Sequence, residues 1–288
     1  MRFANRVVVV TGAARGIGRA TAERFLSEGA SVVLADVDGP ALSETAAAIG
    51  TAERVLAVTT DVAVKAQVDA LIAAAVDHFG RIDVMVNNAG IVVAGPVETL
   101  TPADWRKQLD VNVVGQFAVT AAVLPKLRES RGRVVFISSV NGQLSTPMIG
   151  AYAASKFALE AGAEALRIEL RPWGIPVVVV EPAQTDTDMW RKADDMVTDL
   201  EAGVSPTHHA LYGRHIAGMK KMVPLSQKMA VDPAKVVAVV EEALTARRPK
   251  ARYIVGLGPK LQAALMTNIP ASVRGFLLAK VFGVPRRV

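Results

Sequence analysis

The stretch VVVVTGAARGIGRA, residues 7–20, decides the fold of this chain. Its run of four valines is typical of a strand that is covered on both faces, and from Gly16 onward the pattern changes to the period of a helix. Gly12, Gly16 and Gly18 lie in the turn between the two, where glycine permits a tight bend and a close backbone approach. Because the first N–H groups of a helix attract anions, this turn predicts a pyrophosphate site.

The spacing of these glycines, T-G-x-x-x-G-x-G, differs from the G-x-G-x-x-G of the usual dinucleotide fingerprint, so turn chemistry alone is the alternative. Asp36 follows Gly18 by 18 residues, near the distance at which an acidic residue binds a ribose 2′-hydroxyl. A carboxylate there repels a 2′-phosphate and favours NAD, whereas Arg15 in the turn could pair with that phosphate and favour NADP. We expect NAD, with NADP as the alternative.

Strand and helix patterns alternate through the rest of the chain. The strands expected are residues 6–12, 31–38, 54–62, 81–90, 132–139, 175–182 and 252–256. The helices expected are about 16–28, 40–49, 65–79, 102–127, 151–170 and 233–246. Strands followed by helices form βαβ units, so the prediction is an α/β fold, a Rossmann-type doubly wound parallel sheet of seven strands with helices on both faces.

Composition narrows the class of protein. A chain of 288 residues that is 51% hydrophobic suits one domain with an extension. The absence of cysteine excludes disulfides, thiolate catalysis and cysteine zinc sites. The four histidines lack a metal-ligand spacing, so no metal site is expected. A cytoplasmic protein is expected, because no secretory leader and no apolar run of about 18 residues is found.

The C-terminal third has a different character. After Pro182 the regular pattern fades into a methionine-containing segment, about 187–230, where we expect a substrate lid. Residues 206–288 carry 14 Lys/Arg against 3 Asp/Glu. We expect one domain over 1–258 and an amphipathic helical extension over 259–288 that packs on the body; pairing with a neighbour or binding an anionic membrane surface are alternatives. Nucleic-acid binding is not expected, because interleaved aromatics and a recognised fold are missing.

A second stretch, GAYAASKFALE at 150–160, places Tyr152 and Lys156 four residues apart. On a helix these positions share a face, so the phenol and the ammonium can lie close together. A free phenol ionises near pH ~10, and a neighbouring positive charge lowers that pKa. The pair is therefore interpreted as a general acid and base. A surface tyrosine beside a solvated lysine is the alternative.

Together these motifs resemble the short-chain dehydrogenase/reductase family in its compact single-domain branch. The motifs are TGAARGIG at 11–18, Asp61-Val62, NNAG at 87–90, Asn112, Ser139, YAASK at 152–156 and the run from Pro182 to Thr187. Each is common singly, whereas their occurrence together in this order is specific. The long C-terminal end is similar to that of actinobacterial members related to retinol and hydroxysteroid dehydrogenases.

The resemblance implies a sheet order of 3-2-1-4-5-6-7 and an NAD(P)-dependent oxidoreductase that interconverts a secondary alcohol and a ketone. It implies that Tyr152 exchanges the proton and that Lys156 holds the nicotinamide ribose and lowers the pKa of Tyr152. Ser139 would bond the reacting oxygen, with Ser138 the less favoured choice. Asn112 would anchor a water of a proton relay, although local bonding by an asparagine within a helix is the alternative.

The motifs and the resemblance together define the expected cofactor site. Its residues are Gly12, Arg15, Gly16, Ile17, Gly18, Asp36, Asp61, Val62, Asn88, Ala89, Gly90, Tyr152, Lys156, Pro182, Thr185 and Thr187. Two positions depart from the family pattern: Ala183 stands where glycine is usual, which predicts a stiffer backbone, and Thr185 stands where valine or isoleucine is more common.

A lipophilic substrate is expected, steroid-like, retinoid-like or long-chain, because methionines and a tryptophan suit an irregular apolar guest. The expected substrate pocket consists of Ser139, Gln143, Met148, Tyr152, Met189 and Trp190. The methionines could equally pack the lid onto the body. By resemblance, helices 102–127 and 151–170 pair subunits in a homodimer or homotetramer. A nucleotide-sensing module without turnover and a sugar-nucleotide epimerase or dehydratase on the same scaffold are the rival functions.

Overall fold

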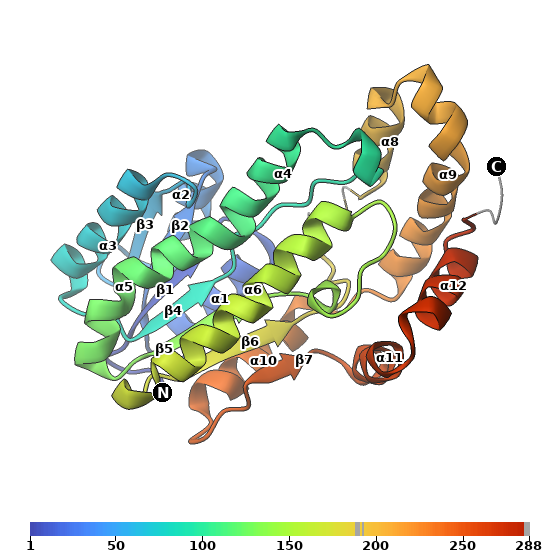
Figure 1. Cartoon of the computed structure of the whole chain (residues 1–288). Helices are drawn as coiled ribbons and strands as arrows, with labels where there is room; N and C mark the ends of the chain where they lie inside the picture. The colour runs from blue at the N-terminus through green and yellow to red at the C-terminus, as the bar shows by residue number, and fades with distance from the viewer. Residues whose placement is uncertain (188–190, 192, 285–288) are drawn as a thin grey trace.

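The chain forms one parallel sheet with helices on both of its faces (Figure 1). The computed structural model describes residues 1–187, 191 and 193–284. The sheet has seven strands in the order β3-β2-β1-β4-β5-β6-β7, and each neighbouring pair is parallel. The predicted fold class and strand order are thereby confirmed.

The strands are β1 (Val7–Thr11), β2 (Ser31–Asp36), β3 (Val55–Thr59), β4 (Val84–Asn87), β5 (Arg133–Ile137), β6 (Val177–Glu181) and β7 (Arg252–Ile254). The helices of the body are α1 (Gly16–Ser27), α2 (Gly39–Ile49), α3 (Lys65–Phe79), α4 (Pro102–Leu109), α5 (Gln116–Ser130), α6 (Gly150–Glu169) and α10 (Pro233–Thr245). Beyond the body, the described part of the chain forms α8 (Ala193–Gly203), α9 (Pro206–Lys228), α11 (Leu257–Asn268) and α12 (Ala271–Val281).

Two hydrophobic cores lie on opposite faces of the sheet. Successive side chains of a strand point to opposite faces, so in β1 Val8 and Val10 join one core while Val7 and Val9 join the other. Helices α1, α2 and α10 pack against the first core, and α3, α5 and α6 pack against the second. The continuous valine runs of the central strands therefore reflect burial on both faces.

The helix expected over 102–127 is interrupted. A π-helical segment, Asp110–Gly115, separates α4 from α5, and α5 runs on to Ser130. The segment contains buried Asn112, whose side-chain oxygen accepts from the Ile91 N–H at 2.8 Å. Hydrophobic spacing does not distinguish a short wider turn from an α-helix, and such turns are frequent at functional sites.

The C-terminal third is more helical than its pattern suggested. The expected lid segment contains α8 and α9, whose packing centres on a cluster of five buried side chains: Met148, Val197, Ile216, Met219 and Val223. The tail forms α11 and α12 on the same side of the molecule as the lid (Figure 1). Since α11 begins at Leu257, the expected domain boundary after residue 258 falls inside a helix. Among the described residues, no helix is both long and apolar enough to cross a bilayer.

Candidate active site

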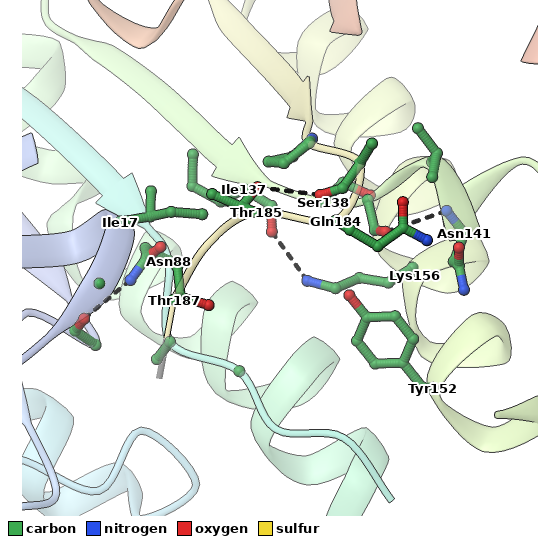
Figure 2. A pocket seen from close by; sticks show the side chains of 18 of the residues that line it. Ile17, Asn88, Ile137, Ser138, Asn141, Tyr152, Lys156, Gln184, Thr185 and Thr187 are labelled. Carbon is green, nitrogen blue, oxygen red and sulfur yellow. Dashed lines mark hydrogen bonds between the residues drawn. The ribbon is translucent and has the colours of Figure 1, made fainter. Parts of the chain in front are cut away.

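A cavity of about 300 Å³ lies at the carboxyl ends of the strands, where an open parallel sheet binds ligands (Figure 2). It receives residues from the turn after β1, the ends of β2, β4, β5 and β6, and the first turns of α6. Its lining residues are Gly12, Arg15, Gly16, Ile17, Asp36, Asn88, Ala89, Gly90, Ile137, Ser138, Ser139, Val140, Asn141, Tyr152, Lys156, Pro182, Ala183, Gln184, Thr185 and Thr187.

The glycine turn at one end of the cavity needs glycine for space and for backbone conformation. Gly12 and Gly16 have φ angles of +63° and +55°, in the left-handed region that other residues rarely adopt. A Cβ on Gly12 would lie 2.8 Å from the Asn88 amide nitrogen. Helix α1 begins at Gly16 without a side-chain cap on its first N–H groups. These features fit the phosphates of a dinucleotide.

Gly18, expected among the cofactor contacts, does not line the cavity. A Cβ on this residue would lie only 2.1 Å from the carbonyl oxygen of Gly12 and 2.6 Å from the Asn88 amide nitrogen. Asn88 in turn donates to the carbonyl oxygens of Thr11 and Gly12 at 2.9 and 3.0 Å. Gly18 therefore acts by letting α1 pack closely against the turn, which shapes the phosphate site indirectly.

Asp36 lines the cavity at the end of β2. Its carboxylate accepts from the backbone N–H groups of Ala14 and Asp38, both at 3.0 Å, so the side chain is held in place. Arg15 forms an ion pair with Asp38. The backbone N–H of Ala41 and this arginine lower the pKa of Asp38. The guanidinium that could have favoured a 2′-phosphate therefore has a carboxylate partner.

Tyr152 and Lys156 lie in the first two turns of α6 and point toward the same part of the cavity (Figure 2). The Lys156 ammonium lies 5.7 Å from the centre of the Tyr152 ring and donates to the carbonyl oxygen of Ile137 at 2.9 Å. Burial lowers the pKa of Lys156 to about 8, and the Glu160 carboxylate opposes this shift. The lysine is thus aligned by β5 and poorly solvated.

The pKa of Tyr152 moves in the direction opposite to the one expected. Burial raises it, and a hydrogen bond with the Ser139 side chain acts against that rise. In this structure desolvation, which penalises the phenolate, has the larger effect. Ser139 lies two residues after the end of β5 at Ile137, and its hydroxyl also accepts from the Asn141 N–H at 3.2 Å.

Asn112 is fully buried and links three segments. Its amide nitrogen donates to the Ile91 carbonyl oxygen at 3.0 Å and to the Ser155 hydroxyl at 3.1 Å, while its side-chain oxygen accepts from the Ile91 N–H. The side chain therefore bonds across the fold, and the alternative of purely local bonding is wrong. These contacts tie the π-helical segment to α6 next to Lys156.

Several other expected site residues lie outside the cavity lining. Asp61 and Val62 follow β3; the Asp61 carboxylate accepts from the Ala63 N–H at 2.9 Å, and Val62 is buried in the core. Gln143 donates to the buried carboxylate of Glu181, which turns it away from the substrate pocket expected for it. Met148 packs in the lid cluster with a φ of +72°. Met189 and Trp190 lie outside the residues that the structure describes.

The segment after β6 completes the cavity. Pro182, Thr185 and Thr187 line it as expected, together with Ala183 and Gln184. The non-glycine residues with positive φ in the described structure are Asn5, Arg131 and Met148. Ala183 is not one of them, so its backbone does not adopt the left-handed conformation that favours glycine. The position where the family usually has glycine can therefore hold alanine here without backbone strain.

Sequence reasoning missed a cluster of charged residues that joins β6, β7 and α6. Arg252 of β7 pairs with Glu181 at 2.5 Å and with Glu160 at 2.9 Å, and both carboxylates are buried. Burial and the neighbouring Glu160 charge raise the pKa of Glu181 to about 7. One residue of this cluster could have been found from the sequence. Glu160 lies four residues after Lys156, so the two share a helix face.

Comparison with known proteins agrees with this geometry. The short chain dehydrogenase family model matches residues 6–198. Galactitol 2-dehydrogenase of Agrobacterium fabrum is 34% identical over 241 residues, which are 83% of this chain and 91% of the relative. The NADPH-dependent 3-dehydrocapnine reductase of Ornithobacterium rhinotracheale is 34% identical over 273 residues, 92% of this chain and 93% of the relative.

A solved structure extends the likeness to three dimensions. The short chain dehydrogenase/reductase from Burkholderia phymatum in complex with NAD has a TM-score of 0.78 and 30% identity, over 92% of this chain and 94% of that one. The chain belongs to the short-chain dehydrogenase/reductase family. It is an NAD(P)-dependent oxidoreductase of the class that acts on alcohol and ketone groups of small molecules.

Proposed function

We propose that this protein interconverts a lipophilic secondary alcohol and its ketone, with NAD as the preferred cofactor and Tyr152 as general acid and base. The observation that carries the proposal is the convergence of Tyr152, Lys156 and Ser139 on one cavity with the glycine turn. Bound NAD(P) supplies the hydride acceptor, and its reduced form supplies the donor. A sensor without turnover has no need of a phenol, an ammonium and a hydroxyl arranged in this way.

The chain's own groups manage the proton and the developing charge. In the reduction, the Tyr152 hydroxyl donates its proton to the substrate carbonyl oxygen, and in the oxidation the same oxygen takes the proton of the alcohol. The Ser139 hydroxyl bonds to the reacting oxygen. The Lys156 ammonium favours the phenolate form that the reduction leaves behind. Asn112 positions α6 through its bonds to Ile91 and Ser155.

The preference for NAD rests on Asp36 and Arg15. The Asp36 carboxylate is fixed in the cavity by two backbone N–H groups, where a 2′-phosphate would meet a like charge. Arg15 is paired with Asp38 and does not offer a free positive charge. One relative is named for NADPH and one structural neighbour contains NAD, so the names of similar proteins do not decide between the two.

The proposal of a lipophilic substrate rests on the lid. Met196 of α8 and Met219 of α9 pack in one cluster with Met148, which lies just before α6. Methionine surfaces adapt to irregular apolar guests. Retention of activity on small polar alcohols, with none on a panel of steroid, retinoid and long-chain alcohols, would contradict this part.

The central test is Tyr152→Phe, with Tyr212→Phe as the matched control. Tyr212 lies in α9 and donates to Glu98, away from the cavity. Turnover is followed by nicotinamide absorbance with both cofactors, and NAD binding by calorimetry. We expect Tyr152→Phe to bind NAD normally and lose about 100- to 10,000-fold in kcat, with the control active. Activity retained in Tyr152→Phe would disprove the proton role.

We also propose a homodimer or homotetramer built on the helical run of α4, the π-helical segment and α5, together with α6. Val114, Phe157 and Ile168, in the π-helical segment and α6, expose 57%, 46% and 69% of their surface. Exposed apolar side chains on neighbouring helices are typical of an interface between subunits. A monomer mass by light scattering would rule this out.

A further inference from the structure

The tail helices α11 and α12 carry two apolar stripes that nothing in the described structure covers. Leu257, Leu261 and Leu265 recur every four residues in α11, as Val273, Leu277 and Val281 do in α12, so each set shares a helix face. The α11 leucines expose 74%, 64% and 65% of their surface. The three α12 residues expose 46%, 40% and 58%. We call these six residues, together with Lys260 and Lys280, the tail surface.

The tail surface is not a packed face of the body. In α10, which precedes it, Val236, Val240, Ala243 and Leu244 are buried against the sheet. In α11 only Ala263 is buried among the described residues, and in α12 none is. The extension was expected to pack on the body, but few of its described side chains are buried in this way. An apolar surface of this extent is normally covered by a partner or a lipid phase.

The charge of this region is entirely positive. From residue 243 to the end of the sequence there are nine Lys/Arg and no Asp/Glu. Lys260 lies three residues after Leu257, and Lys280 lies three residues after Leu277, so each apolar stripe has an ammonium on its flank. Both lysines are exposed, and within the described part of the chain neither takes part in a salt bridge.

This charge discriminates between the candidate partners. In a symmetric dimer each copy presents the same patch, so a basic surface would face another basic surface. An anionic lipid surface has the complementary charge, and each Lys or Arg near it strengthens binding about fivefold. Helices with apolar residues on one side and basic residues beside them lie in the plane of such an interface.

We propose that the tail surface docks the protein onto anionic lipid bilayers, with α11 and α12 lying in the interface and not crossing it. The C-terminal end of α12 reaches the lid, because Gly218 of α9 lies against the carbonyl oxygen of Phe282. Figure 1 shows α12 beside α9, so docking through the tail surface would bring the lid near the lipid. The proposal concerns binding alone and holds whatever the substrate is.

The test is flotation of the full chain with phosphatidylcholine vesicles that contain or lack phosphatidylserine, at low and at high salt. We expect wild type to float with the anionic vesicles at low salt and to be released at high salt. Leu261→Glu removes an apolar contact and adds a like charge, so we expect about tenfold less bound protein. Lys260→Glu with Lys280→Glu should reduce binding at least as much.

Val64→Glu is the matched control. Val64 precedes α3 and is 40% exposed, so this change adds the same charge to an exposed apolar site remote from the tail. The control should float like wild type, and circular dichroism should show all variants folded. Three results would overturn the proposal: wild type that does not float, flotation unchanged by Leu261→Glu, or equal flotation with neutral vesicles. Light scattering that shows Leu261→Glu breaking a wild-type oligomer would point to a second copy as the partner.

Discussion

The sheet body and the C-terminal lid and tail differ in how their side chains are held. In the body, the catalytic candidates lie on α6 and after β5, two elements that pack into the continuous cores, and the Lys156 ammonium donates to the Ile137 carbonyl oxygen of β5. The lid packs around five buried side chains, and α12 buries none. The residues proposed for chemistry are therefore on the most constrained part of the molecule, whereas the residues proposed for substrate and membrane contact are on the least constrained part.

This difference separates two physical requirements. Proton and hydride transfer need groups fixed to within a fraction of an ångström, which strands and a buried helix provide. Admitting an apolar substrate or covering a lipid surface needs segments that can move, and such segments have few buried contacts. Five substitutions should sharpen or break this contrast.

The largest effect is expected for Gly18→Ala in the body. The new methyl group would lie 2.1 Å from the Gly12 carbonyl oxygen, so α1 or the glycine turn must shift. We expect a loss of about 4 kcal/mol in the free energy of unfolding and no measurable NAD binding. Urea unfolding and calorimetry check both. Normal NAD binding by this variant would mean that the turn is as adaptable as the lid.

A matched pair of isoleucines compares the two regions directly. Ile82 is fully buried in the second core of the body, and Ile216 is 1% exposed in the lid cluster. Truncation of a buried isoleucine to alanine costs about 3 kcal/mol where the site is part of the cooperative unit. We expect Ile82→Ala to lower the global free energy of unfolding by that amount and to leave KM for the alcohol unchanged.

Ile216→Ala should instead loosen the lid while the body stays folded. We expect a smaller change in the urea midpoint, faster proteolysis within α8 and α9, and a higher KM at nearly unchanged kcat. Limited proteolysis followed by mass spectrometry locates the cuts. Equal losses of global stability in the two variants would show that lid and body unfold as one unit.

Glu181→Gln probes the charge cluster of the body through pH. Burial raises the pKa of Glu181 from 4.5 to about 7, so between these values only the unfolded chain ionises this group. The free energy of unfolding should therefore fall by about 2 kcal/mol as pH rises from 4.5 to 7. The glutamine variant should lack this slope. Glu129→Gln, at an exposed position, serves as the control and should keep the pH dependence of wild type. If Glu181→Gln also keeps that pH dependence, a group other than Glu181 causes it.

The smallest effect is expected for Gly275→Ala in the tail. Gly275 lies within α12, and a Cβ there meets no atom within 4 Å. Alanine should stabilise the helix by up to about 1 kcal/mol. Hydrogen exchange should slow in α12 while the urea midpoint of the body stays the same. A lower midpoint would show that the tail packs on the body more closely than its exposure indicates.

Much of the fold could be predicted because its signals are local. Valine runs, glycine turns and helical spacing each depend on neighbours in the sequence, and they predicted the parallel sheet and most helix ends. The order of the strands was implied by the family resemblance and not by these local signals. The π-helical segment at Asp110–Gly115 escaped, since a wider turn leaves no mark in hydrophobic spacing. The lid helices escaped because they pack around a small cluster, which weakens their apolar periodicity.

For the site, the sequence placed Tyr152, Lys156, Ser139 and the glycine turn on the right elements. It could not tell that Gln143 turns toward Glu181 or that Met148 packs under the lid, since both depend on segments distant in the sequence. The direction of the Tyr152 pKa was mistaken for a related reason. Spacing reveals that a charge is near, whereas burial, which here has the larger effect, is a property of the assembled fold.

The sequence by itself determined the doubly wound sheet, the glycine turn and the Tyr152–Lys156 pair, because these follow from short-range patterns and fixed spacings, and the order of its motifs indicated the family. Only the tertiary structure decided which carboxylates share Arg252, which methionines pack the lid and which apolar residues of the tail stay uncovered. Those outcomes depend on contacts between distant segments and on the water that these contacts exclude. Neither the long-range contacts nor the exclusion of water can be inferred from any single stretch of the chain.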